Sequence, residues 1–205
     1  MRVRFGASNP PPVLKGADMA IRSRTVAWTV IANLIAGVAV AGETNARPAV
    51  VIRLDNRVQM PDREMGAAKA EMERVFRTAG VDIVWTDAAE LRGLTLILVN
   101  ATGPSGVIVP EDRDVAGAAS RLTRRAYVFP DRLTAASRNR QTDAPVVLGR
   151  VMAHEIGHLL LPANSHSRLG IMRPHVDFSQ VSVHCFAADQ ARTIRTELSG
   201  TAARP

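Results

Sequence analysis

The chain has 205 residues, 46% of them hydrophobic, and a formal net charge of +7 at pH 7. This length predicts one domain or slightly more, and the apolar content is typical of a globular core. The charge is mostly arginine and is dispersed, with Arg121, Arg124 and Arg125 as its densest group, and aromatic residues make up only 4%. Because nucleic-acid binding needs a dense basic surface, we expect no nucleic-acid partner and interpret these arginines as a solvated loop.

Residues 1–46 are predicted to be an N-terminal extension that contains a signal peptide. Two arginines precede an uncharged, mostly apolar run at residues 25–42, and small residues close this run up to Ala41. A basic start, an apolar middle and a small-residue end are typical of a secretory signal. We therefore expect cleavage near Ala41 and a secreted or periplasmic protein, with Met19 as the true start. The alternative is an uncleaved membrane anchor, although the run is near the lower length limit for spanning a bilayer.

Residues 47–205 are predicted to form one α/β domain. Short runs rich in β-branched residues predict strands at residues 49–54, 81–85 and 94–99. Between the first two, apolar residues at helical spacing predict a helix over residues 61–79, which Gly80 ends. A strand, helix and strand in this order predict a parallel pair joined by a right-handed crossover. The third strand is apolar throughout, so we expect it at the centre of the sheet.

Three further short strands are expected, at residues 107–109, 115–119 and 126–129. Glu111, Asp112 and Asp114 lie between the first two of these strands. Three acids in a loop could hold a structural calcium ion, but the spacing is not that of an EF-hand. We therefore interpret this segment as a solvated loop, with calcium as the less favoured alternative.

A helix that Asp143 is expected to cap, with Pro145 in its first turn, carries two histidines. His154 and His158 are four residues apart, so both imidazoles project from nearly one face and can reach a single ion. Glu155 points off the line between them, where a carboxylate can polarise a bound water without being a ligand. Histidine, glutamate, two residues and histidine on a helix form the pattern of a zinc metalloprotease.

A catalytic zinc ion needs three protein ligands and one open position. Pro162 is expected to end the helix, and His166 is the first strong donor in the loop that follows. Asp177 and then His175 rank behind it as alternative third ligands. Met172 follows in a Gly-Ile-Met turn and could form an apolar floor under the imidazoles.

Residues 154–172 resemble the signature of the metzincin clan of zinc metallopeptidases. The resemblance implies that His154, His158 and His166 are zinc ligands. It implies that Glu155 is the general base and that Met172 is the Met-turn residue. It also implies a zincin fold, a single domain with a twisted mixed sheet, a crossover helix and an active-site helix. The chain departs from the pattern because the family's glycine falls at Leu161 and its third-histidine position at Asn164. His166 therefore needs a loop two residues longer.

The function that we expect is that of an exported zinc metalloendopeptidase acting on a peptide or protein. The small residues at 115–119 suit an edge strand beside the cleft, where an extended peptide could pair with free backbone groups. A proline at Ala118 is the expected way to weaken that pairing. The alternative is an exported, non-catalytic zinc-binding protein on the same fold. A structural helix with incidental histidines, which would bind no stoichiometric metal, is the third interpretation.

After the candidate site the sequence predicts a last helix, marked by apolar residues at Ala187, Ala191, Ile194 and Leu198. His184 is expected to be structural or on the surface. Cys185 is the one cysteine of the chain, so it cannot form an internal disulfide. We expect a half-buried thiol that packs beside Phe186.

Overall fold

The structure is a computed structural model, and it describes residues 3–4, 47–88, 93–101, 110–112, 115–137, 143–176 and 184–202. The chain divides into two units, of which residues 12–46 form one and the remainder forms the other. Everything that is described belongs to the second unit. The predicted signal segment, the predicted strand at 107–109, and the residues Asp114 and Asp177 lie outside the described residues.

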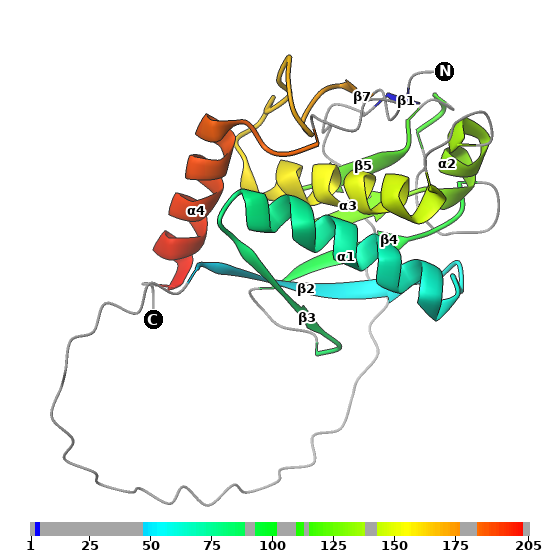
Figure 1. The fold of residues 1–205 in the computed structure, drawn as a ribbon, viewed down its shortest axis with the longest axis horizontal. Helices are drawn as coiled ribbons and strands as arrows, with labels where there is room; N and C mark the ends of the chain where they lie inside the picture. Colours follow the sequence, from blue (N-terminus) through cyan, green and yellow to red (C-terminus); the bar gives the residue numbers. More distant parts are fainter. Residues whose placement is uncertain are drawn as a thin grey trace, which may run out of the picture. The chain divides into compact units, whose positions relative to one another are not determined.

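A five-stranded mixed sheet forms one layer of this unit (Figure 1). Its strands are β2 (Ala49–Asn56), β3 (Asp82–Thr86), β4 (Leu94–Leu98), β5 (Gly117–Ser120) and β6 (Arg125–Val128). The order across the sheet is β3-β2-β4-β6-β5, and β5 alone runs antiparallel to its neighbour. The predicted α/β class is confirmed, and the predicted central strand, β4, is the middle one.

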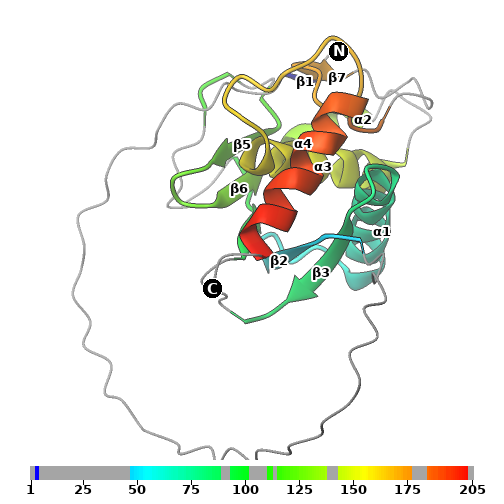
Figure 2. The same ribbon diagram turned by 90° about the vertical axis from the view of Figure 1, so that its left-hand side faces the viewer.

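Two long helices, α1 (Asp62–Thr78) and α3 (Ala144–Leu160), lie side by side against one face of the sheet (Figures 1 and 2). The helix α1 connects the parallel neighbours β2 and β3, which confirms the predicted parallel pair with a helix between its strands. Gly80 ends it as expected, with φ of 76°. The N–H of Val81 donates to Phe76 O at 3.1 Å, and the N–H of Gly80 donates to Arg77 O at 3.0 Å. These two bonds form a Schellman motif, which needs a left-handed residue.

Two shorter helices complete the fold, α2 (Pro130–Ser137) and α4 (Ala188–Ala202). The helix α2 was not predicted from the sequence, although a proline and an aspartate open its first turn. The helix α4 was predicted, and it lies across the end of α1 and α3 (Figure 2). Arg195 anchors α4 there, because its Nη1 donates to Ala79 O at the end of α1, at 2.6 Å.

The predicted cap of α3 is wrong in one respect. Asp143 occupies the N-cap position and Pro145 lies in the first turn, but the carboxylate of Asp143 makes no capping hydrogen bond. Pro145 stands at the second helical position and has no N–H, so it removes one of the two donors that a cap side chain can bind. The cap residue contributes only its backbone, whose carbonyl accepts from Val147 N at 3.1 Å.

The prediction of a half-buried Cys185 is also wrong, because its side chain is exposed. Its neighbour Phe186 is buried and meets the ring of Phe76 edge-on, with the centroids 5.1 Å apart. Burial alternates along this segment, because His184 and Phe186 are buried while Cys185 is exposed. Burying Phe186 therefore turns Cys185 outward, and only the backbone carbonyl of Cys185 points inward, where it accepts from Ile171 N at 2.8 Å.

Two residues that the sequence analysis assigned to the N-terminal extension form a strand. The strand β1 (Val3–Arg4) pairs antiparallel with β7 (His175–Val176) in a separate two-stranded sheet. Among the residues that the structure describes, no helix has the length and apolar character needed to span a bilayer.

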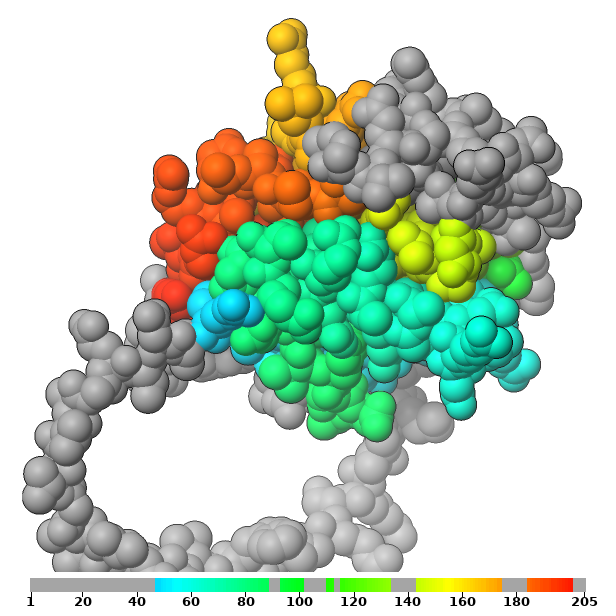
Figure 3. Space-filling model, viewed as in Figure 1, coloured from blue at the N-terminus to red at the C-terminus, as the bar shows by residue number. Residues whose placement is uncertain are grey.

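The helix α3 is buried along most of its length. In the space-filling view, α1 and α4 form much of the visible surface, and mainly the first turns of α3 show between its neighbours (Figure 3). Arg150, which is 6% exposed, is held inside by an ion pair with Glu71 of α1 at 2.8 Å. Burial raises the pKa of Glu71, but hydrogen bonds from Arg74 and Arg150 outweigh it and lower the pKa overall. The helix is thus fixed to α1 one turn before His154.

At Gly149, α3 approaches α1 closely. A Cβ at this position would contact the backbone carbonyl of Ala68 and lie 2.9 Å from Glu71 Cβ. We expect Gly149→Ala to destabilise the protein by about 1–3 kcal/mol, because a backbone atom cannot move aside as a side chain can. Chemical denaturation should show the loss.

The matched control for this substitution is Gly66→Ala on α1, where a Cβ would meet nothing within 4 Å. This change should raise stability by about 0.5–1 kcal/mol, since alanine favours the helix more than glycine does. Equal effects of the two substitutions would contradict the close contact at Gly149.

Candidate metal centre

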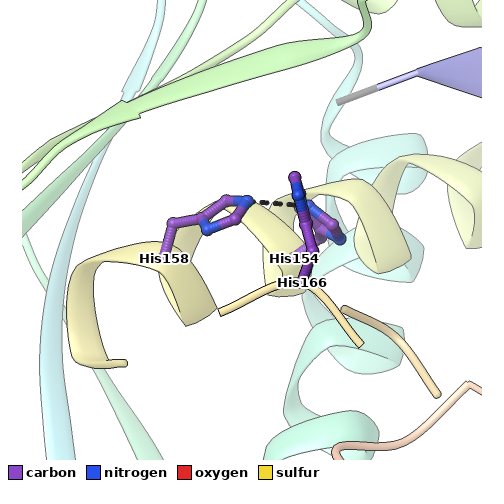
Figure 4. Close-up of side chains that lie close together, drawn as sticks. All are labelled: His154, His158 and His166. Atoms are coloured by element: carbon purple, nitrogen blue, oxygen red, sulfur yellow. Dashed lines mark hydrogen bonds between the residues drawn. The ribbon is translucent and has the colours of Figure 1, made fainter. Parts of the chain in front are cut away.

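Three imidazoles converge at the C-terminal half of α3. His154 and His158 come from the helix and His166 from the loop that follows, and their rings lie close together (Figure 4). The ring centroids are 4.7 to 5.4 Å apart, and one nitrogen from each ring lies within 4.8 Å of the other two. Among the residues that the structure describes, this is the one group of three or more potential metal ligands.

The orientation of His154 is set by a backbone carbonyl. His154 is fully buried, and its Nδ1 lies 2.7 Å from Ile171 O. Because a carbonyl only accepts, Nδ1 carries the proton and Nε2 is left as the acceptor. That Nε2 points into the cluster, 2.9 Å from Nε2 of His158. A ring held in this way presents a lone pair to a cation.

His158 has a hydroxyl partner. Its Nδ1 lies 3.2 Å from Ser165 Oγ, so its Nε2 faces His154. A hydroxyl can donate or accept, so it adapts to either tautomer of the ring. Ser165 directly precedes His166, and the same short loop therefore orients one imidazole and supplies another.

The loop after α3 accommodates the two extra residues before His166. Asn164 adopts φ of 59°, a left-handed conformation that asparagine tolerates better than most residues, and it turns the chain back. Two side chains from other elements hold the loop. Arg121 Nη1 donates to Leu161 O at 2.6 Å, and Gln190 Nε2 donates to Ser165 O at 2.9 Å.

Met172 packs against α3 at Gly157. A Cβ on Gly157 would lie 2.6 Å from Met172 Sδ and 2.9 Å from Phe186 Cε1. Met172 is fully buried, and its carbonyl accepts from Ser167 N at 2.9 Å. The turn at Met172 is thus fixed both to the helix and to the loop that bears His166.

Glu155 lies on another side of the helix, against the edge of the sheet. A Cβ on Gly117 of β5 would be 2.6 Å from Glu155 Oε1, so only glycine leaves room for the carboxylate. Glu155 is 1% exposed, and neither of its oxygens has a hydrogen-bond partner. Burial therefore raises its pKa well above the usual value. A carboxyl group with a raised pKa is suited to exchange protons near neutral pH.

Burial has the opposite effect on the histidines. Desolvation, together with the neighbouring His158 and His166, lowers the pKa of His154 well below its usual value. Desolvation and the charge of His166 lower the pKa of His158 to about 4. Both imidazoles are therefore neutral at pH 7, which is the state that binds a metal.

These pKa directions predict how the metal-free protein responds to acid. Below pH 6.5 the unfolded chain protonates His154 and His158, while the folded chain keeps them neutral, so stability falls as the pH drops from about 6.5 toward 4. Glu155 acts in the opposite sense, because its carboxyl group takes up a proton in the folded state first. Two histidines outweigh one carboxyl group, so the net slope keeps the sign that the histidines set, with stability falling as the pH drops.

Urea denaturation of the metal-free protein at several pH values measures this slope. Glu155→Gln removes the opposing carboxyl group, so the slope should become steeper in that variant. A stability that does not change between pH 6.5 and 4.5 in both proteins would show that the buried histidines do not titrate as inferred.

The structure brings together His154, His158 and His166, which the sequence analysis selected as ligands. Of the two alternatives, Asp177 lies outside the described residues, and only the backbone of His175 is described. The calcium alternative involves Asp114, which is also outside them. His184, expected to be structural or on the surface, is buried.

Sequence reasoning missed three residues that touch the site or its supports: Gly117, Ser165 and Gln190. Each contacts its partner only in the folded chain, and Gln190 meets Ser165 across 25 residues. A glycine in a strand and a glutamine at the start of a helix were the available signals, and neither indicates a metal site by itself.

No known protein-family model matches this chain, and no curated protein matches it. Among solved structures, it is similar to a zinc-dependent peptidase from Methanocorpusculum labreanum (strain Z). The TM-score is 0.42 and the sequence identity 16%, over 73% of this chain and 99% of that chain. A likeness of this size leaves the function to be argued from the site itself.

Proposed function

We propose that this chain is a zinc-dependent metallopeptidase of metzincin type, with His154, His158 and His166 as ligands and Glu155 as general base. The observation that carries the proposal is the convergence of three imidazoles at one point, with their ligand nitrogens within 4.8 Å of one another. Met172, packed under the helix that bears two of them, is proposed as the Met-turn residue.

The donor set fits zinc. Zinc accepts imidazole nitrogen at about 2.0–2.1 Å, and a catalytic zinc site has three protein ligands with a fourth position open. Small side-chain rotations would bring nitrogens that already lie within 4.8 Å onto one ion. The Ile171 carbonyl and the Ser165 hydroxyl are the outer partners that such ligands need.

A zinc ion held by His154, His158 and His166 would supply Lewis-acid chemistry, which lowers the pKa of a bound water and polarises a carbonyl. Glu155 is proposed to take the proton from the attacking water and then to donate it to the leaving amine. It is buried and its oxygens make no competing hydrogen bond, so the carboxyl group is available for both transfers. No described residue is assigned as a second electrophile.

The edge strand β5 is proposed to bind an extended peptide beside Glu155. Phe129 N donates to Ala116 O at 2.9 Å, and the register pairs Ala118 with Tyr127. Antiparallel pairs alternate, so the N–H of Ala118 faces β6, while Gly117 and Ala119 present their backbone groups to the other edge. A proline at Ala118 would therefore break the sheet itself, and the informative position is Ala119.

We expect Ala119→Pro to lower kcat/KM for peptides by about tenfold, because one backbone hydrogen bond to the substrate is lost. Zinc content should stay the same. Peptide kinetics together with metal analysis would measure both quantities. Ala118→Pro should instead lower the melting temperature. If Ala119→Pro leaves the kinetics unchanged, the peptide does not pair with β5.

The site of action is proposed to be outside the cytoplasm. The support is the predicted signal sequence at residues 25–42 alone. Mass determination of the mature protein from the exporting cell would show whether the chain begins after Ala41.

The whole proposal is tested by metal analysis of the purified protein together with a broad peptide-cleavage screen. One zinc ion per chain and cleavage that a chelator abolishes are the expected results. One zinc ion without cleavage of any peptide would favour the non-catalytic zinc-binding protein. The absence of stoichiometric metal would overturn both functions.

A further inference from the structure

Gln190 of α4 connects two parts of the molecule that its position in the sequence does not link. Its side chain is 8% exposed and makes two hydrogen bonds with different partners. The Oε1 accepts from Ala187 N at 3.1 Å, and the Nε2 donates to Ser165 O at 2.9 Å. An N–H on one side and a carbonyl on the other fix which end of the amide is oxygen.

The first of these bonds belongs to α4. Ala187 directly precedes the first helical residue, and Gln190 is the third residue of the helix, so its side chain caps the free N–H at the start of α4. The helix is held independently of this cap. Ala191 and Ile194 are buried in the core, and Arg195 binds the carbonyl of Ala79.

The second bond belongs to the loop after α3. Ser165 presents its hydroxyl to His158 Nδ1 and is followed by His166. The Ser165 carbonyl that accepts from Gln190 therefore belongs to the peptide unit that joins Ser165 to His166. A shift of this carbonyl would move the hydroxyl partner of His158 and the backbone of His166.

We propose that Gln190 is a positioning residue of the metal centre, which fixes the Ser165–His166 peptide unit to the start of α4. This inference rests on the proposed zinc site for its effect on metal binding. A primary amide is required at this position, because the side chain must accept from Ala187 and donate to Ser165 at once. A carboxylate can accept but cannot donate.

Gln190→Glu in the full chain separates the two bonds. The carboxylate keeps the cap of α4, and its negative charge suits a helix N-terminus. On the other side it turns an oxygen toward Ser165 O, so the bond becomes a repulsion. We expect zinc to bind about tenfold more weakly, the lower end of the effect of outer partners on metal affinity. Competition with a chelator measures the dissociation constant.

Thr193→Ala is the matched control on the same helix. Thr193 Oγ1 bonds only within α4, to Asp189 O at 3.0 Å, and faces solvent. This variant should bind zinc as the unmodified chain does. Cobalt in place of zinc gives a second readout, because its visible absorption should change in Gln190→Glu and stay the same in Thr193→Ala. Unchanged zinc affinity in Gln190→Glu would overturn the inference.

Hydrogen exchange of the metal-free chain distinguishes a failure of this inference from a failure of the proposed function. In Gln190→Glu the amides of Ser167 and Ile171, which bond across the site, should exchange faster. The amide of Ala191, within α4, should not. Faster exchange in both segments, or in neither, would show that Gln190 only caps its helix, whether or not the chain binds zinc.

Gln190→Met serves if the glutamate variant does not fold. Methionine is of similar length and uncharged, and it removes both hydrogen bonds. Zinc affinity should again fall about tenfold relative to Thr193→Ala. Equal affinities of these two variants would contradict a positioning role.

Discussion

Glu155→Gln should reduce peptide turnover by about 10²- to 10⁴-fold, which is the usual contribution of a general acid–base group. Glutamine has nearly the same shape and fills the same space beside Gly117, but it cannot take up the proton of the attacking water. The three histidines are not altered, so zinc binding should remain. Steady-state kinetics on a cleaved peptide and metal analysis of the same preparation would measure the two quantities separately.

Glu64→Gln is the control for this experiment. Glu64 is an exposed residue in the first turn of α1, and its substitution should leave turnover unchanged. If the Glu155 variant keeps its activity, the assigned base is wrong. If it loses zinc together with activity, Glu155 belongs to the structure of the site and the kinetic result says nothing about proton transfer.

His166→Ala should weaken zinc binding strongly, because it removes one of three direct ligands. Loss of an outer partner lowers metal affinity by about 10- to 100-fold, and the effect here should be larger. The side chain comes from a loop and is only partly buried, so its loss leaves the core intact. The melting temperature of the metal-free protein should therefore change little. Competition with a chelator and thermal unfolding without metal would measure the two effects.

The same experiment decides between the candidates for the third ligand. His175→Ala and Asp177→Ala should each bind zinc as the unmodified chain does. A loss of zinc in either variant, combined with unchanged affinity in His166→Ala, would transfer the role to that residue. The convergence of His154, His158 and His166 is the reason to expect the first result.

The order of the secondary structure could be predicted from the sequence because it depends on near neighbours. The apolar spacing before Gly80 and the β-branched runs predicted α1 and the strands that flank it to within one or two residues. Pro162 correctly ended the helix that carries the histidines. The helix α2 was missed because it is short and begins directly after β6, where the sequence favours a strand as much as a turn.

The errors arise where the outcome depends on a partner that is distant in sequence. Cys185 was expected to be half-buried beside Phe186, yet Phe186 packs on Phe76 and Cys185 is exposed. Ala118 was chosen for the proline test because its segment has little side-chain bulk and because the resemblance implies an antiparallel edge strand. The register with β6 assigned its N–H to the sheet and left Ala119 at the free edge.

The sequence by itself determined which donors this protein has and how two of them are spaced. His154 and His158 are four residues apart on one helix, so they lie on the same face whatever surrounds them, because helical geometry is local. Only the tertiary structure decided that His166 meets them, that Gly117 makes room for Glu155 and that Gln190 holds the loop. These contacts join separate elements, and their geometry depends on how side chains from each element fill the space between them.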